Sequence, residues 1–208
     1  MDKFSEAAAF AIRLHDGTER KGDGLPYILH PMEAATIVST LTKDQDVLSA
    51  AVLHDTIEDA GTTIEEIEQR FGKRVAELVA AETEDKREHL PADQTWLVRK
   101  QEAIEVLKNT NDIDVKRVFL GDKLSNMRSF NRDLQKYGDK LWDRFNQKDP
   151  KMHAWYYRSI ADTMTELQDT PALLGIYAEK AWQSGKAHHE RSVMQENLLH
   201  DLQNAIGE

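Results

Sequence analysis

Four ionisable side chains follow an apolar run that begins at residue 49 and ends at residue 53. They are His54, Asp55, Glu58 and Asp59. If the segment is helical, residues four apart share a face, so His54 and Asp55 each have a carboxylate one turn further along. Three carboxylates so close together repel one another, and a divalent cation would relieve that repulsion. A solvated acidic helix end is the alternative interpretation of this segment taken alone.

Two further segments carry residues of the same chemical types. His30 lies at a junction between a loop and a helix, from which an imidazole can point inward. Asp122 lies one turn before Asn126, in a segment whose apolar residues are expected to face the core. A carboxylate in such a place costs free energy unless it is paired or bound to metal. Each residue alone also has a structural explanation, a helix cap for the histidine and a salt bridge for the aspartate.

The candidate ligand set consists of two imidazoles and two carboxylates: His30, His54, Asp55 and Asp122. Such a set suits Mn, Fe, Co, Ni or Zn better than Ca or Mg. Because the chain has no cysteine, any metal must be held by His, Asp or Glu. A bound metal would lower the pKa of a water molecule and polarise phosphorus. Glu58 and Asp59 could accept or orient the proton of that water.

The charge balance restricts the class of partner. The chain has 37 acidic and 27 basic residues, which give a formal net charge of −10. A field of this sign repels polyphosphate backbones, so we expect no nucleic-acid partner. A small anionic substrate would need a local cluster of cations or a metal. The following basic residues flank the candidate ligands in the sequence: Arg20, Lys21, Lys86, Arg87, Arg99, Lys100, Lys123 and Arg128.

Helical periodicity dominates the chain and supplies the elements that must position these residues. The pattern predicts helices over about 3–16, 31–41, 46–58 and 95–109, then 114–130, 151–169 and 172–205, with a loop over 84–95. Thr63 and Glu66 resemble a capping box, and Gly72 is a plausible helix end. Without a run of alternating strands, the economical fold class is an all-α bundle. We expect one domain over 1–170 and a C-terminal helical extension over 171–208 that packs on it.

No segment approaches the ~20 apolar residues of a membrane span, so we expect no membrane contact. The first residues carry charges where a signal peptide needs apolar residues, which predicts a cytoplasmic protein. The oligomeric state stays open.

The motifs in chain order resemble those of the hydrolase domain of the RelA/SpoT homologue enzymes, which degrade the alarmones pppGpp and ppGpp. The similarity covers residues 5–130 well and 150–168 loosely, and it is specific because the motifs occur as a set. The motifs are Arg20-Lys21, Pro26-Tyr27-Ile28-Leu29-His30-Pro31, His54-Asp55-Thr56-Ile57-Glu58-Asp59, Phe71-Gly72, Thr83-Glu84-Asp85-Lys86 and Asp122-Lys123-Leu124-Ser125-Asn126-Met127-Arg128.

The resemblance implies an HD-domain helical bundle of the single-domain small alarmone hydrolase type. It implies hydrolysis of the 3′-pyrophosphate of (p)ppGpp to GDP or GTP plus pyrophosphate, with one Mn²⁺ per chain. The metal ligands would be His30, His54, Asp55 and Asp122. Glu58 and Asp59 would activate water, and the planar guanidinium of Arg20 would stack on the base. The other expected substrate-binding residues are Lys21, Tyr27, Lys86, Lys123, Asn126, Arg128 and, from a loose match, Tyr156.

The chain departs from that family at Gly121, where Ala is usual, and at Ser125, where His or Tyr is common. Residues 142–157 are also more aromatic and basic than expected. One alternative is therefore an HD phosphohydrolase that acts on another nucleotide, such as ppApp, NADPH or a nucleoside monophosphate. Another is a nucleotide sensor without turnover, against which the complete set of ligands and water-activating carboxylates argues.

Overall fold

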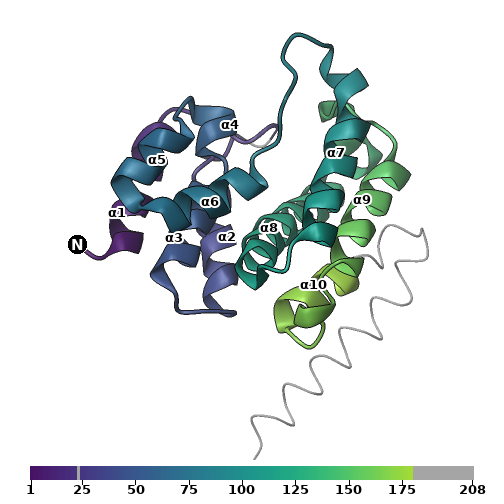
Figure 1. The fold of residues 1–208 in the computed structure, drawn as a ribbon. Helices are drawn as coiled ribbons and strands as arrows, with labels where there is room; N and C mark the ends of the chain where they lie inside the picture. Colours follow the sequence, from purple (N-terminus) through teal and green to yellow (C-terminus); the bar gives the residue numbers. More distant parts are fainter. Residues whose placement is uncertain (23, 180–208) are drawn as a thin grey trace, which may run out of the picture.

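The structure is a computed structural model, and it describes residues 1–22 and 24–179 (Figure 1). Within these ranges every regular element is a helix, and the sole β pairing is an isolated bridge between Glu19 and Pro26. The all-α fold class is therefore confirmed. The elements are α1 (Lys3–Leu14), α2 (Leu29–Ser39), α3 (Gln45–Leu53), α4 (Thr56–Ala60), α5 (Ile64–Phe71), α6 (Lys73–Glu82), α7 (Ala92–Asn109), α8 (Ile113–Tyr137), η1 (Gly138–Arg144), α9 (Pro150–Asp162), η2 (Thr165–Leu167) and α10 (Pro171–Glu179).

Helix α8 is the central element of the bundle. It packs against α2, α3 and α6 on one side, and α7 and α9 lie together on its other side (Figure 1). Its apolar residues Leu120, Leu124 and Met127 are at most 1% exposed. Burial of one such side chain stabilises the fold by about 1.5–3 kcal/mol. This anchoring fixes the polar residues of α8 that lie between these apolar positions.

The chain turns sharply at His54 and Asp55. The prediction of one helix over 46–58 was wrong here, because α3 ends at Leu53 and α4 begins at Thr56. The Thr56 hydroxyl donates to the Leu53 carbonyl oxygen at 2.7 Å, so it satisfies a carbonyl group at the break. Gly61, with φ of 71°, then ends α4 in the left-handed region. The two adjacent residues therefore lie at a corner between helices.

Gly121 allows α2 and α8 to approach closely. A Cβ atom at this position would lie 2.6 Å from Val38 Cγ2 and 2.8 Å from the Ala34 carbonyl oxygen. Both neighbours belong to α2, and one of them is backbone. The missing side chain therefore brings His30, on α2, next to Asp122, on α8.

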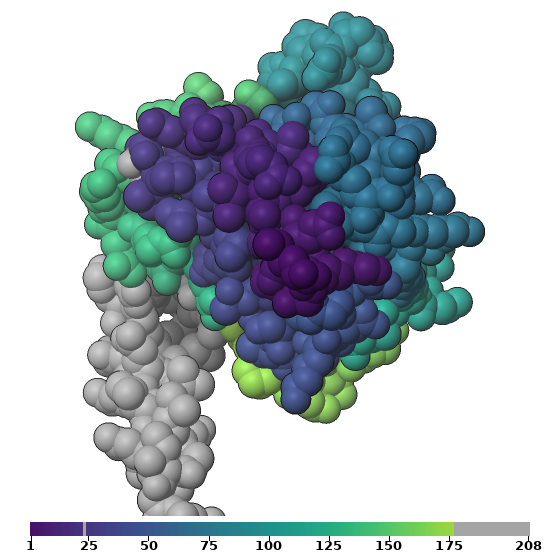
Figure 2. All heavy atoms as spheres, turned by 90° about the vertical axis from the view of Figure 1, so that its left-hand side faces the viewer, coloured from purple at the N-terminus to yellow at the C-terminus, as the bar shows by residue number. Residues whose placement is uncertain are grey.

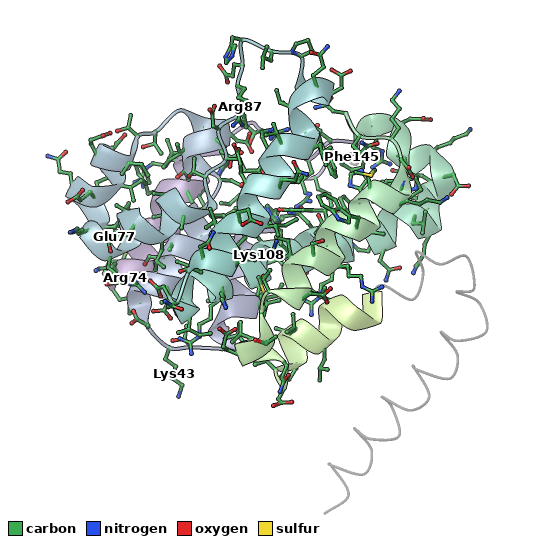
Figure 3. The ribbon with its side chains drawn as sticks, turned by 45° about the vertical axis from the view of Figure 1, so that its right-hand side comes forward. Lys43, Arg74, Glu77, Arg87, Lys108 and Phe145 are labelled. Atoms are coloured by element: carbon green, nitrogen blue, oxygen red, sulfur yellow. The ribbon has the colours of Figure 1, made fainter. Side chains whose placement is uncertain are left out.

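The loop over residues 83–91 joins α6 to α7 and projects from the surface in Figure 2. The expected loop over 84–95 is shorter in the structure, because α7 already begins at Ala92. Arg87, labelled in Figure 3, has φ of 49°, and its guanidinium lies 2.5 Å from the Glu102 carboxylate on α7. The ion pair holds the loop against α7.

Helix α10 packs against α8 and α9, and its residues Leu173 and Ile176 are buried. Residues 171–179 therefore continue the bundle. The division of the chain at residue 170 stays a prediction, and the expected extension over 180–208 lies outside the described residues. None of the helices that the structure describes combines the length and the apolar character needed to span a bilayer.

Candidate metal centre and active-site cavity

Three of the four expected ligand side chains, His30, His54 and Asp122, place their ligand atoms within 4.8 Å of one another, and Asp55 lies against both histidines. His30 Nε2 lies 3.2 Å from His54 Nε2, 3.0 Å from Asp122 Oδ1 and 3.3 Å from Asp55 Oδ2. His54 Nε2 lies 3.0 Å from Asp55 Oδ2 and 3.5 Å from Asp122 Oδ1. Helix α2, the corner between α3 and α4, and α8 supply these groups. The cluster is buried except for the Asp55 side chain, which is 17% exposed.

The donor set fits a divalent cation. His54 Nδ1 lies 2.8 Å from the Ala51 carbonyl oxygen, so that nitrogen must carry a proton and donate it. The Nε2 atom of the neutral ring then presents a lone pair to a second imidazole and to two carboxylates. These groups repel one another unless a cation or a proton lies among them. A divalent metal site is thus consistent with both the geometry and the chemistry of the residues.

The pKa directions in the cluster describe the same electrostatics. Burial disfavours the charged form of His54, but Asp55 and Asp122 outweigh it and raise the pKa of His54 well above its usual value. Burial likewise opposes ionisation of the two aspartates. The histidine charge holds the pKa of Asp55 well below its usual value, and Lys123 does the same for Asp122. In the metal-free protein a proton therefore takes the place of the cation.

Glu58 and Asp59 lie beside the ligand cluster in different environments. Glu58 Oε1 accepts a hydrogen bond from the Glu84 backbone N–H at 2.6 Å. Burial raises the pKa of Glu58 to about 7, although this hydrogen bond opposes the shift. Asp59 is more exposed and pairs with Lys86. A carboxylate whose pKa lies near neutrality is suited to accept a proton from water.

The Tyr27 hydroxyl bridges two of these carboxylates. It lies 2.7 Å from Asp55 Oδ2 and 3.1 Å from Asp59 Oδ2. Burial and the neighbouring carboxylates raise the pKa of Tyr27, so the hydroxyl stays protonated and acts as a donor. Tyr27 therefore orients Asp55, one of the candidate metal ligands, in addition to any contact with substrate.

A cavity of about 470 Å³ opens beside the cluster. Ligand cavities in proteins commonly have volumes of about 300–1,000 Å³. Eleven of the fourteen expected site residues line it: Arg20, Lys21, Tyr27, His30, Asp55, Glu58, Asp59, Asp122, Lys123, Asn126 and Tyr156. The other three do not line the cavity: His54 lies within the ligand cluster, Lys86 pairs with Asp59, and Arg128 pairs with Glu33.

Asn126 connects the loop before α2 to the ligand cluster. Arg20 Nη2 donates to Asn126 Oδ1 at 3.0 Å, and Asn126 Nδ2 donates to Asp122 Oδ1 at 2.5 Å. The amide thus uses both of its polar ends. The pair of contacts holds the Arg20 guanidinium at the cavity wall, where a planar group could stack on a base.

Three of the expected substrate-binding cations are paired with carboxylates of the protein. Lys123 is buried and bonds to Asp122 and to Glu82, the latter at 2.7 Å. Lys86 Nζ donates to the Glu58 carbonyl oxygen at 2.6 Å and pairs with Asp59. Arg128 does not line the cavity; its side chain is 46% exposed and its guanidinium lies 3.5 Å from the Glu33 carboxylate. Their roles as substrate contacts stay predictions.

A second part of the cavity lining was only partly predicted from the sequence, where Arg99 and Lys100 were expected near the ligands and Tyr156 at the substrate. Lys100 and Arg99, on α7, pair with Glu84 at 2.6 and 3.0 Å, and Lys100 Nζ lies 4.8 Å from the centre of the Tyr156 ring. An aromatic group completes this wall: Trp96, Phe130, Phe145, His153 and Tyr157. Phe145 is labelled in Figure 3. The aromatic excess over residues 142–157 was the sequence signal for Phe145, His153 and Tyr157, whereas no pattern indicated Trp96 and Phe130.

His15 is a further cavity residue that the motifs did not reveal. It is 3% exposed, and its ring lies 4.9 Å from the Tyr27 ring. Neither of its ring nitrogens has a hydrogen-bond partner among residues 1–22 and 24–179. Burial lowers the pKa of His15, so the ring is neutral beside the carboxylates.

Comparisons with known proteins agree with this site. The family model described as "HD domain" matches residues 7–150. The human guanosine-3′,5′-bis(diphosphate) 3′-pyrophosphohydrolase MESH1 is 43% identical over 130 residues, which span 61% of this chain and 69% of the human protein. The Aquifex aeolicus guanosine-3′,5′-bis(diphosphate) 3′-pyrophosphohydrolase is 36% identical over 128 residues, which span 62% of this chain and only 18% of that protein.

Solved structures support the same relationship. The structure of a metazoan ortholog of SpoT, described as hydrolysing ppGpp, is 29% identical with a TM-score of 0.70, and the match covers 89% of this chain and 97% of that one. A Listeria monocytogenes protein is 29% identical with a TM-score of 0.64, covering 74% of this chain and 97% of the other. The chain belongs to the HD-domain family and is a homologue of the guanosine-3′,5′-bis(diphosphate) 3′-pyrophosphohydrolases.

Proposed function

We propose that this chain is a metal-dependent hydrolase that removes the 3′-pyrophosphate of guanosine alarmones. It converts ppGpp to GDP and pppGpp to GTP, and it releases pyrophosphate in both reactions. The observation that carries the proposal is the convergence of two imidazoles and two carboxylates beside a cavity of about 470 Å³. The name shared by the human and Aquifex aeolicus relatives supports the same substrate class.

The proposed cofactor is one Mn²⁺ ion, held by His30, His54, Asp55 and Asp122. This mixture of imidazole and carboxylate ligands suits a transition metal better than Mg²⁺ or Ca²⁺. When bound, the ion supplies Lewis-acid polarisation of the phosphoryl group and makes a water molecule more acidic. A cytoplasmic location and a free nucleotide as the partner stay predictions that accompany this proposal.

Glu58 is the proposed general base. Its pKa of about 7 lets it accept a proton from the attacking water at neutral pH. The water oxygen attacks the phosphorus attached to the ribose 3′ oxygen, and the bond between that phosphorus and that oxygen breaks. The 3′ oxygen leaves with a proton, which balances the proton that Glu58 takes from water, so the products are a 3′-hydroxyl nucleotide and pyrophosphate. Asp59 holds the hydroxyl of Tyr27 and the ammonium of Lys86 beside this reaction.

The substrate contacts follow from the cavity walls. The Arg20 guanidinium, fixed by Asn126, stacks on the base, and Lys21 lies at the same end of the cavity for a phosphate. Tyr156 forms part of the opposite wall. Lys123 acts on the substrate mainly through Asp122, to which its ammonium is bonded. Lys86 and Arg128 would have to leave their present carboxylate partners to reach a phosphate.

The test incubates the full chain, stripped of metal, with ppGpp and either Mn²⁺ or a chelator, and separates the nucleotide products. GDP and pyrophosphate should form in the reaction with Mn²⁺ and not in the reaction with chelator. Parallel reactions with ppApp, NADPH and a nucleoside monophosphate measure the alternatives. Turnover of one of these in place of ppGpp would contradict the proposed substrate. Binding of ppGpp without turnover of any nucleotide would contradict the proposed activity and favour a sensor.

A further inference from the structure

Three side chains connect the surface of the protein to one of the candidate metal ligands. Glu33 and His30 lie three residues apart on α2, and Ser125 faces them from α8. Ser125 Oγ lies 2.9 Å from Glu33 Oε2 and 2.9 Å from His30 Nδ1. Ser125 is completely buried and His30 is 3% exposed, whereas the Glu33 side chain is 28% exposed. The chain of hydrogen bonds thus ends at the buried imidazole.

The direction of these hydrogen bonds follows from the number of protons. A serine hydroxyl has one proton to donate, and an ionised carboxylate can only accept. The Ser125 hydroxyl therefore donates to Glu33 and accepts a hydrogen bond from His30 Nδ1–H. In the neutral ring of His30, the proton then lies on Nδ1 and the lone pair lies on Nε2. That lone pair points at His54 and Asp122, as a metal ligand requires.

The two histidines of the cluster are oriented by different means. His54 Nδ1 donates to the Ala51 carbonyl oxygen, a backbone group that no substitution removes. His30 depends on a hydroxyl, which can donate as well as accept. Without Glu33, the Ser125 hydroxyl could rotate and donate to Nδ1, which would favour the ring form protonated at Nε2. That form has no lone pair for a metal.

We propose that Ser125 and Glu33 are positioning residues that fix the tautomer and the orientation of His30 for metal binding. The inference rests on the metal site of the proposed function. Removing one partner that orients a metal-bound histidine typically weakens metal affinity about 10–100-fold. Ser125 is also a position at which this chain departs from the pattern of the family it resembles. The small hydroxyl leaves room for the carboxylate of Glu33 behind it.

The test measures the Kd of Mn²⁺ by titration calorimetry on the full chain after metal is stripped. Ser125→Ala and Glu33→Ala should each weaken binding about 10–100-fold. Glu33→Gln should keep most of the affinity, because its amide oxygen still accepts the serine proton although the charge is gone. Ser39→Ala is the matched control: it removes a serine hydroxyl at the exposed end of α2 that donates to the Thr36 carbonyl oxygen. Its Kd should equal that of the unsubstituted chain.

The variants separate this inference from the proposed function. If the unsubstituted chain binds Mn²⁺ and hydrolyses ppGpp while Glu33→Ala and Ser125→Ala keep the same Kd, the positioning role is wrong and the function stands. If the unsubstituted chain binds no Mn²⁺, both are wrong. Because Glu33 is partly exposed, Glu33→Ala tests the inference even if Ser125→Ala does not fold. A Glu33→Gln variant as weak as Glu33→Ala would contradict the hydrogen-bond mechanism.

Discussion

Glu58 is the residue whose environment bears most directly on catalysis. Its carboxylate is buried beside the ligand cluster, and its pKa rises to about 7, so a fraction of the protein holds the base form at neutral pH. The position of Glu58 one turn beyond the ligands could be predicted from the sequence. Its pKa could not, because the upward shift arises from burial in the folded chain and is opposed by a hydrogen bond from the Glu84 N–H, which lies 26 residues away.

The Glu58→Gln variant should bind Mn²⁺ normally and lose about 10²–10⁴-fold in kcat, because an amide cannot accept the proton of the water. For the unsubstituted chain, kcat should fall as the pH drops below about 7, since the base becomes protonated. Titration calorimetry and a pH–rate profile check the two statements. Unchanged turnover in the variant would remove Glu58 from the mechanism.

The same pKa predicts a pH-dependent stability of the metal-free chain. The unfolded glutamate ionises near pH 4.5 and the folded one near 7, so the stability that protonated Glu58 contributes is fully present below about pH 4.5 and is lost as the pH rises to about 7. The free energy of unfolding of Glu58→Gln minus that of the unsubstituted chain, both with chelator, should therefore be about 3 kcal/mol larger at pH 8 than at pH 4. Urea unfolding of both proteins at the two pH values measures this. If the two proteins differ in free energy of unfolding by the same amount at pH 4 and at pH 8, the shifted pKa of Glu58 is contradicted.

At the scale of elements, the starts of most helices followed from the apolar period and the caps, but several ends did not: α8 continues past the predicted end at 130 to Tyr137, and the helix expected over 151–169 ends at Asp162. Thr63 accepts the Glu66 N–H at 3.2 Å and Gly72 ends α5, as the capping pattern predicts. The break at His54 and Asp55 could not be predicted, because both residues fit the helical period. At this break the Thr56 hydroxyl donates to the Leu53 carbonyl oxygen. The aromatic wall depends on α7 and α9 lying together, which no local pattern indicates.

The contact between α2 and α8 is predicted to depend on Gly121. An Ala side chain there would overlap Val38 and the Ala34 carbonyl oxygen, so Gly121→Ala should lower the free energy of unfolding by about 1–3 kcal/mol. It should also weaken Mn²⁺ binding, because the two helices supply different ligands.

Gly175→Ala on α10 is the matched control, since its Cβ would lie 3.3 Å from the Leu124 side chain, a longer contact than those at Gly121. It should destabilise less than Gly121→Ala, because the overlap is smaller and Ala has the higher helix propensity. Urea unfolding of both variants measures the difference. Equal effects of the two substitutions would contradict the close packing at Gly121.

At the scale of the whole molecule, the ligands come from elements that are far apart in the sequence. His30 and Asp122 are separated by 92 positions, and both meet the corner at His54 and Asp55. A bound ion therefore joins α2, the α3–α4 corner and α8. Metal binding and folding should be coupled, since the unfolded chain does not hold these groups together.

Mn²⁺ at about 100 times its Kd should raise the free energy of unfolding by about 2.7 kcal/mol. For a chain of this length, that corresponds to a rise in Tm of about 5–10 °C. Chelator should reverse the rise, and Asp55→Ala should abolish both the rise and the hydrolysis. Thermal melts with and without Mn²⁺ measure the effect. A Tm rise of the same size in Asp55→Ala would mean that the metal binds elsewhere.

In the proposed reaction, water attacks the phosphorus bonded to the ribose 3′ oxygen of ppGpp at this metal-dependent site. The most direct measurement is the reaction of the full chain with ppGpp and Mn²⁺ in ¹⁸O-labelled water, followed by mass spectrometry of the products. The expected products are GDP without label and pyrophosphate that carries one ¹⁸O atom. Intact ppGpp, label in the GDP, or labelled phosphate together with a 3′-phosphorylated nucleotide would contradict it.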